Sequence, residues 1–162
     1  MPGTPDRKSA ERMDFRGFDV VGGHFTIEEA RRHVAFNQIP ILSMVRNPVD
    51  RCISETYRRI RNGNWDEEGN EHPAVRFARE YGSVMSEQLG GSVPQDVTFG
   101  VFERYQESLE MFADKFAWDQ VPVLAHENAG NNRVEPENSV RDTIAGLLED
   151  DFRIYDEVVA SF

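Results

Sequence analysis

Five arginines gather within residues 41–61, ILSMVRNPVDRCISETYRRIR. Arg46 ends an apolar run, and Asn47 and Pro48 follow it directly. Asparagine is a favoured N-cap and proline a favoured first helical residue, so the stretch predicts a strand that passes into a helix at Pro48. A helix N-terminus carries unpaired N–H groups and a partial positive charge. Both favour binding of a phosphate or sulfate at this point.

The predicted helix places Arg51, Ser54 and Arg58 on one face, because their spacing is i, i+3, i+7. Two guanidinium groups, one hydroxyl and free backbone amides could bind a phosphate dianion, with arginine offering two parallel hydrogen bonds. An alternative fits the same residues, namely a solvent-exposed face of arginines that pair with carboxylates. The spacing alone leaves both interpretations open.

The string Arg46-x-Pro48-x-x-Arg51-x-x-Ser54, placed after an apolar strand, resembles the 3′-phosphate-binding element of sulfotransferases. Those enzymes use 3′-phosphoadenosine 5′-phosphosulfate (PAPS). The resemblance implies that Arg46 and Ser54 hold the 3′-phosphate of this cofactor, and the shared helix face adds Arg51 as a further cofactor-binding candidate. Family members usually have Asp where this chain has Asn47, a residue that also suits a helix cap.

The segment GGHFTIEEA, residues 22–30, resembles a segment of the heparan sulfate and uronyl 2-O-sulfotransferases. A histidine of that segment is the proposed catalytic base in those enzymes, which implies this role for His24; a structural loop histidine is the alternative. Some members have a second histidine two positions earlier, where this chain has Gly22. FGVFERYQESLEMF and NSVRDTIAGLLEDDFRIYDEV also resemble later segments of the family, so that the resemblance spans residues 18–160.

The family also begins with a strand and a P-loop-like turn whose lysine contacts the 5′-phosphosulfate. Before His24 the chain offers Lys8, which follows no apolar strand and lies in no glycine-rich turn, so we assign it no role. We therefore expect a sulfotransferase that lacks this N-terminal unit and transfers a sulfuryl group from PAPS to a hydroxyl acceptor, such as a small molecule or a saccharide. The alternatives are a truncated, inactive nucleotide- or anion-binding remnant and a purely structural or interaction domain.

Strand patterns alternate with helix patterns along the chain, which predicts an α/β domain with a mostly parallel sheet and flanking helices. The resemblance implies a partial P-loop-NTPase-like sulfotransferase domain at residues 18–162, after a frayed lead-in at 1–17. Thr26 and Glu29 form a capping-box pattern. The expected strands are 18–25, 39–45, 97–102 and 121–126, the second of them buried on both faces, and the expected helices are 27–36, 48–61, 74–89, 103–116 and 139–161.

Charge and composition limit the partners of this 162-residue chain. The net charge is −11, with +3 on residues 1–61 and −14 on residues 62–162, which argues against general nucleic-acid or anionic-membrane binding. A single cysteine excludes a disulfide framework, and no histidine spacing indicates a metal site, so we expect no metal. No apolar run reaches the length of about 20 residues that spans a bilayer. We expect a soluble, cytoplasmic protein. The sequence does not indicate its oligomeric state.

Overall fold

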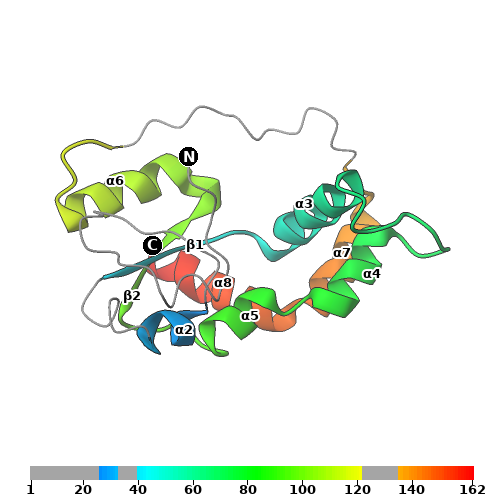
Figure 1. Cartoon of the computed structure of the whole chain (residues 1–162), viewed down its shortest axis with the longest axis horizontal. Coiled ribbons are helices and arrows are strands. Elements are labelled where there is room, and N and C mark those ends of the chain that lie inside the picture. Colours follow the sequence, from blue (N-terminus) through cyan, green and yellow to red (C-terminus); the bar gives the residue numbers. More distant parts are fainter. Residues whose placement is uncertain (1–25, 33–39, 122–134) are drawn as a thin grey trace.

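The computed structural model describes residues 26–32, 40–121 and 135–162 of the chain. Helices make up most of it, and two strands form a small sheet (Figure 1). The elements in chain order are α2 (Ile27–Arg32), β1 (Ile41–Val45), α3 (Pro48–Arg61), α4 (Pro73–Tyr81), α5 (Val84–Leu89), β2 (Val97–Val101), the 3₁₀ helix η1 (Phe102–Arg104), α6 (Tyr105–Phe116), α7 (Asn138–Leu147) and α8 (Glu149–Ser161).

Strands β1 and β2 are parallel neighbours, with Ile41 opposite Val97 and Val45 opposite Val101. The chain passes through α3, α4 and α5 between them, as a parallel pair requires a long connection. The prediction of a mixed α/β domain with a parallel sheet is confirmed for this pair. The predicted strand at 18–25 and nearly all of the one at 121–126 lie outside the described residues.

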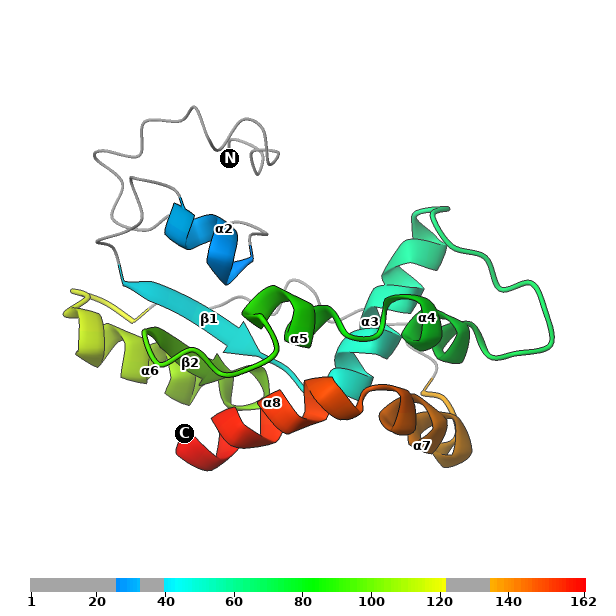
Figure 2. The same cartoon turned by 90° about the horizontal axis from the view of Figure 1, so that it is seen from below.

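Helices cover both faces of β2. Gly100 faces α6, because a methyl group at Gly100 would lie only 2.6–2.9 Å from Met44 Sδ, Ser108 Cβ and Phe112 Cζ. Val101 points to the other face, into a core shared with Ile154 of α8. Figure 1 shows α6 above and α8 below the strand pair, and Figure 2 shows α8 continuing from α7. The glycine therefore allows a close approach of α6 that no other residue would permit.

The expectation that the strand at 39–45 is buried on both faces is wrong. Only Val45 of β1 is buried, and the other four residues of the strand are partly exposed. Among the described elements, α6 and α8 make their main contacts to the sheet through β2. A continuous apolar run shows which residues favour a strand, but the position of the covering helices decides how far each strand is buried.

The buried apolar residues form two clusters. A helical core joins α3, α4 and α7, and a sheet core joins α2, β1, α5, β2 and α8. The helical core contains Val49, Cys52, Ile53, Ala74, Val75, Phe77, Ala78, Ile144 and Leu148. The sheet core contains Ile27, Val45, Met85, Leu89, Val97, Val101, Ile154 and Val158. Helices α3 and α8 contact each other and so connect the two regions.

Local capping signals in the sequence are confirmed. The backbone N–H of Thr26 donates to Glu29 Oε2 at 2.8 Å, and the N–H of Glu29 donates to Thr26 Oγ1 at 3.0 Å, which is a complete capping box. Helix α3 runs over Pro48–Arg61 as predicted, with Asn47 as its N-cap. Both signals depend only on residues within one turn of each other.

Two long helices predicted from the sequence are each broken in the structure. The predicted helix 74–89 divides into α4 and α5 at Gly82 and Ser83, and the predicted helix 139–161 divides into α7 and α8 at Leu148. The predicted helix 103–116 starts later, as α6 at Tyr105, after a 3₁₀ turn. Leu148 is buried in the helical core, whereas α8 beyond it packs against the sheet core. The break lets one chain segment serve both cores.

Ser108 joins α6 to the end of β2. Its hydroxyl is fully buried, accepts a hydrogen bond from the backbone N–H of Val101 at 2.8 Å and lies 2.9 Å from the carbonyl of Arg104. We predict that Ser108→Ala lowers the free energy of unfolding by about 1–3 kcal/mol, because it leaves the Val101 N–H buried without an acceptor. Urea unfolding measures this loss. Ser86→Ala, on an α5 side chain that is partly exposed, is the comparison, and equal losses would contradict the assignment.

Candidate anion site at the carboxyl end of the sheet

The carboxyl ends of β1 and β2 meet at one edge of the sheet. Val45 lies opposite Val101, so the residues that follow each strand come side by side. Arg46 and Asn47 follow β1, and Phe102 and Glu103 follow β2. In sheets of parallel strands this is the edge at which ligands bind. The predicted anion-binding segment therefore lies at the edge that its strand–helix pattern indicated.

Asn47 caps α3 with its side chain. Its Oδ1 accepts the backbone N–H groups of Val49 at 3.1 Å and Asp50 at 3.2 Å. Pro48 has no N–H, and the N–H of Arg51 donates to the carbonyl of Asn47 at 2.9 Å. The first-turn donors are thus bonded within the chain, and the expectation of free backbone amides is wrong. An anion here would depend on side chains and on the helix dipole.

Arg46 is partly buried, and its guanidinium lies 4.8 Å from the centre of the Phe102 ring. Phe102 is one of the exposed large hydrophobic residues, with 45% of its surface accessible. Among the described residues no carboxylate pairs with Arg46. A cation held on a ring keeps its hydrogen-bond donors available, since the ring face binds charge and not N–H groups. Arg46 is therefore suited to receive an anion.

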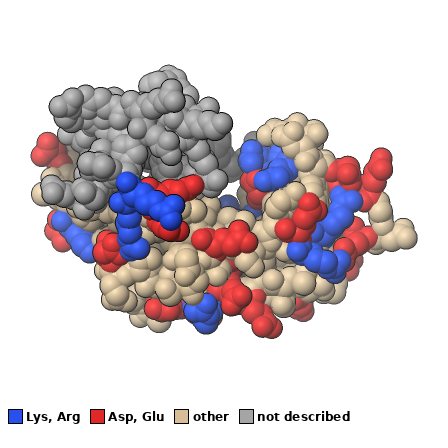
Figure 3. Space-filling model, turned by 60° about the horizontal axis from the view of Figure 1, so that its bottom comes forward, with Lys and Arg blue, Asp and Glu red and all other residues tan. Residues whose placement is uncertain are grey.

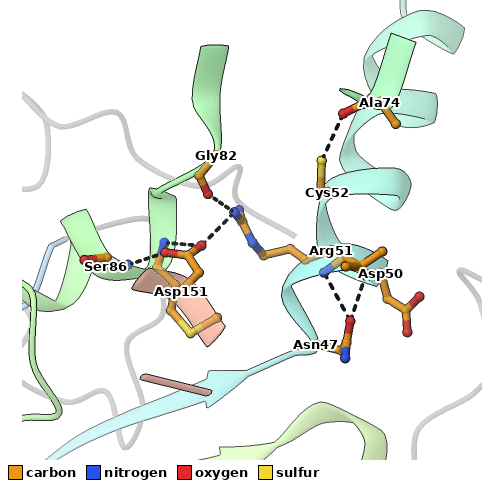
Figure 4. Close-up of polar contacts among 10 residues, drawn as sticks. Asn47, Asp50, Arg51, Cys52, Ala74, Gly82, Ser86 and Asp151 are labelled. Atoms are coloured by element: carbon orange, nitrogen blue, oxygen red, sulfur yellow. Dashed lines mark hydrogen bonds and ion pairs between the residues drawn. The ribbon is translucent and has the colours of Figure 1, made fainter. Parts of the chain in front are cut away.

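Arg51 has a different environment from Arg46. One terminal nitrogen of its guanidinium lies 3.4 Å from the carbonyl oxygen of Gly82 and 3.4 Å from Asp151 Oδ2. Figure 4 shows the side chain reaching from α3 toward Asp151 of α8. The role of Arg51 in cofactor binding stays a prediction, and the contact that the structure gives it is an ion pair with a buried carboxylate.

Two further arginines of α3 pair within the helix. Glu55 accepts hydrogen bonds from Arg58 at 2.6 and 2.7 Å and from Arg59 at 2.9 Å. The hydrogen bond from Arg58 is the main cause of a lowered pKa for Glu55, and burial opposes it. Arg59 also lies over the rings of Phe77 and Tyr81. For Arg58 and Arg59, pairing with a carboxylate thus describes the structure better than a shared phosphate cradle does.

Ser54 is the seventh residue of α3 and is partly exposed. At a rise of about 1.5 Å per residue it lies roughly 10 Å along the helix axis from Asn47. An anion in contact with Ser54 therefore lies beside the second turn of α3 and not at its tip. Arg46 would have to extend along the helix to share that anion.

Two residues singled out in the sequence lie outside the described part of the chain. They are His24, the candidate base, and Lys8, to which we assign no site role. Within the described residues no group of three or more His, Cys, Asp or Glu could hold a metal ion. No described helix combines the length and the apolar character that crossing a bilayer requires.

Glu103 is a residue of this edge that sequence reasoning assigned only to a helix start. Its Oε1 accepts the backbone N–H of Asn47 at 2.8 Å, and its Oε2 accepts the Tyr155 hydroxyl at 3.3 Å. The register of the sheet could have indicated the first contact, because Asn47 and Glu103 each stand two residues beyond a paired strand end. Nothing in the spacing pointed to Tyr155.

Cys52 is unsuited to nucleophilic chemistry. Its side chain is buried, its thiol contacts the carbonyl of Ala74 at 3.4 Å, and burial raises its pKa to about 11. The thiolate, which is the reactive form, is therefore scarce at neutral pH. Cys52 serves the contact between α3 and α4 as a small apolar residue.

Positive and negative side chains are mixed on the face shown in Figure 3, with no broad area of one sign among the described residues of that face. Several of the arginines stand in ion pairs, such as Arg31 with Asp96 and Arg76 with Asp66. A wide basic surface of the kind that binds a nucleic-acid backbone is thus absent from the described part of this face. Selective binding of an anion would need a local site.

Comparison of the chain with family models, with curated proteins and with solved structures found no match. A functional assignment therefore depends on the geometry described above and on the residue pattern of the sequence.

Asp151 is the buried partner of Arg51. Its carboxylate also accepts the backbone N–H groups of Met85 at 3.2 Å and Ser86 at 2.8 Å, at the start of α5 (Figure 4). Burial raises the pKa of Asp151 above its ordinary value, although both N–H donors and Arg51 act in the opposite direction. The native state therefore takes up this proton at a higher pH than the unfolded chain does.

We predict that the stability advantage of the parent chain over Asp151→Asn grows as the pH falls from 7 toward 4. A raised native pKa makes ionised Asp151 unfavourable near neutrality, and this cost disappears once the native carboxyl is protonated. Urea unfolding of both proteins at several pH values measures the difference, in which carboxylates common to the two cancel. An advantage that shrinks on acidification would mean that Arg51 and the two N–H groups hold the pKa down instead.

Proposed function

We propose that the chain binds PAPS through its 3′-phosphate at the carboxyl end of β1 and transfers the sulfuryl group to a hydroxyl acceptor. The observation that carries the proposal is the position of Arg46. It stands between a parallel strand and the N-terminus of α3, and among the described residues no carboxylate neutralises it. The Arg46–Ser54 string resembles the 3′-phosphate-binding element of sulfotransferases. This resemblance supports the same assignment.

In this proposal Arg46 and Ser54 hold the 3′-phosphate. Arg46 offers a planar fork of N–H donors that suits phosphate oxygens, and Ser54 offers one hydroxyl from a partly exposed position on α3. The positive end of the α3 dipole adds attraction, since the first turn points to the same edge. Arg51 fixes α3 against Asp151, which keeps Ser54 at a set place relative to the sheet.

The reaction needs a base and a leaving group. His24 would take the proton of the acceptor hydroxyl while its oxygen bonds to sulfur, and the bond from sulfur to the 5′-phosphate oxygen would break with its electrons on adenosine 3′,5′-bisphosphate. A neutral imidazole suits this step because the ordinary pKa of histidine, about 6.5, lies near working pH. A saccharide hydroxyl is the acceptor class that the resemblance implies.

A binding protein without transferase activity is the second candidate. Glu103 lies next to the first turn of α3 and opposes an anion there. Asp50, in that turn, pairs with Arg141 at 2.7 Å, and the first-turn amides are already bonded. An anion site of this kind would hold the nucleotide less tightly than one with free amides. Nucleotide binding and sulfuryl transfer therefore need separate tests.

We predict that Arg46→Ala weakens binding of adenosine 3′,5′-bisphosphate by about 1.5–3 kcal/mol, the range for a hydrogen bond to a charged group. Isothermal titration calorimetry measures this loss. Arg58→Ala removes an arginine from the same helix that pairs with Glu55, so its affinity should stay near that of the parent. Equal losses in both variants, or a folded parent chain that binds no bisphosphate, would overturn the proposed 3′-phosphate site.

We predict that His24→Ala keeps the affinity for adenosine 3′,5′-bisphosphate and lowers the rate of sulfuryl transfer by about 10²- to 10⁴-fold, the range for loss of a general base. Transfer is followed with ³⁵S-labelled PAPS and a set of saccharide acceptors. His72→Ala provides the comparison, because His72 caps α4 with its own ring nitrogen. Binding without any transfer in the parent chain would favour the second candidate.

A further inference from the structure

Glu103 contacts the anion-binding turn without belonging to the proposed ligand set. Its two carboxylate oxygens accept hydrogen bonds from two different elements. One oxygen lies 2.8 Å from the backbone nitrogen of Asn47, and the other lies 3.3 Å from the Tyr155 hydroxyl. Asn47 belongs to the turn after β1, and Tyr155 belongs to α8. One exposed side chain therefore joins the turn, the end of β2 and a helix of the sheet core.

These contacts fix the main chain on both sides of Arg46. On one side Val45 is paired with Val101 in the parallel ladder, and on the other side the N–H of Asn47 donates to Glu103. The partners at both points, Val101 and Glu103, belong to one continuous segment, which is the end of β2 and the turn after it. The backbone position from which the Arg46 side chain starts is thus set by residues 101–103.

The charge of Glu103 works against an anion at the same place. A carboxylate one hydrogen bond away from the turn repels phosphate and weakens the attraction of the helix N-terminus. Any favourable contribution of Glu103 to anion binding must then come from its hydrogen bond to the main chain. The two effects can be separated, because glutamine keeps an acceptor oxygen and removes the charge.

Tyr155 holds the other oxygen of Glu103. Burial raises the pKa of Tyr155, and the nearby Glu103 charge raises it further, so that the hydroxyl keeps its proton and remains a donor at neutral pH. Tyr155 also packs against the sheet core and against the Phe152 ring. The Glu103 side chain is thereby oriented from a rigid part of the molecule.

We propose that Glu103 is a positioning residue for the anion site, which holds the Arg46–Asn47 turn through the Asn47 N–H and links that turn to α8 through Tyr155. The proposal rests on the proposed function for the identity of the anion. Glu103 does not touch the nucleotide; it acts through the backbone from which Arg46 extends.

Binding of adenosine 3′,5′-bisphosphate to three forms of the full chain tests the proposal. Glu103→Gln should bind about two- to five-fold more tightly than the parent, because a repelling charge is gone and the acceptor stays. Glu103→Ala should bind at least about five-fold more weakly than Glu103→Gln, because the acceptor is gone as well. Glu110→Gln and Glu110→Ala make the same changes on an exposed residue of α6 and should not differ from each other.

Two results would overturn the positioning role. Glu103→Ala and Glu103→Gln could both bind more tightly than the parent by the same factor, which would show that the hydrogen bond contributes nothing. Both variants could instead bind more weakly than the parent by the same factor, which would show that a neutral acceptor does not replace the carboxylate. Circular dichroism and urea unfolding verify that every variant is folded before its affinity is compared.

Amide hydrogen exchange at Asn47, measured by NMR without nucleotide, separates this proposal from the proposed function. Exchange should be faster in Glu103→Ala than in the parent and intermediate in Tyr155→Phe, which keeps the ring and loses only the hydroxyl. Unchanged exchange in Glu103→Ala rejects the positioning role whatever the affinities are. A parent chain that binds no bisphosphate rejects the proposed function, and the exchange data alone then decide whether Glu103 holds the turn.

Discussion

The buried carboxylate of Asp151 is the contact on which the arrangement of the helices depends. It accepts two backbone N–H groups at the start of α5 and faces the guanidinium of Arg51, so that one side chain of α8 binds both α5 and α3. A carboxylate without partners in such a place would cost several kcal/mol. The three donors must therefore stay close to this carboxylate, which fixes α5 and α3 relative to α8.

This junction lies between the helical core and the sheet core. α3 starts at the carboxyl end of the sheet and buries Val49 and Ile53 in the helical core, while α8 buries Ile154 and Val158 against β2. The proposed site draws on both regions, since Arg46 belongs to the sheet edge and Ser54 to the body of α3. The geometry of the site therefore depends on the relative position of the two cores, as well as on the residues that would touch the ligand.

Sequence reasoning succeeded where the deciding contacts are local. The Thr26–Glu29 capping box and the Asn47–Pro48 start of α3 involve residues at most three positions apart, and both were predicted correctly. It failed where the deciding partner is remote: Arg51 and Asp151 stand 100 positions apart, and the breaks at Gly82 and Leu148 follow from packing between distant helices. In the site, the position of Arg46 followed from the strand–helix pattern of the sequence. The hydrogen bonds from the first-turn amides to Asn47 and the contact with Glu103 could be seen only in the structure.

The burial of Cys52 gives the protein an internal reporter. It is the only sulfhydryl in the chain, it lies at the contact between α3 and α4, and burial raises its pKa to about 11, so that little thiolate forms at neutral pH. An alkylating reagent therefore reacts with it efficiently when these two helices separate, which exposes the thiol and lets it ionise. The rate of thiol labelling thus reads out local opening of the helical core, in a background free of competing cysteines.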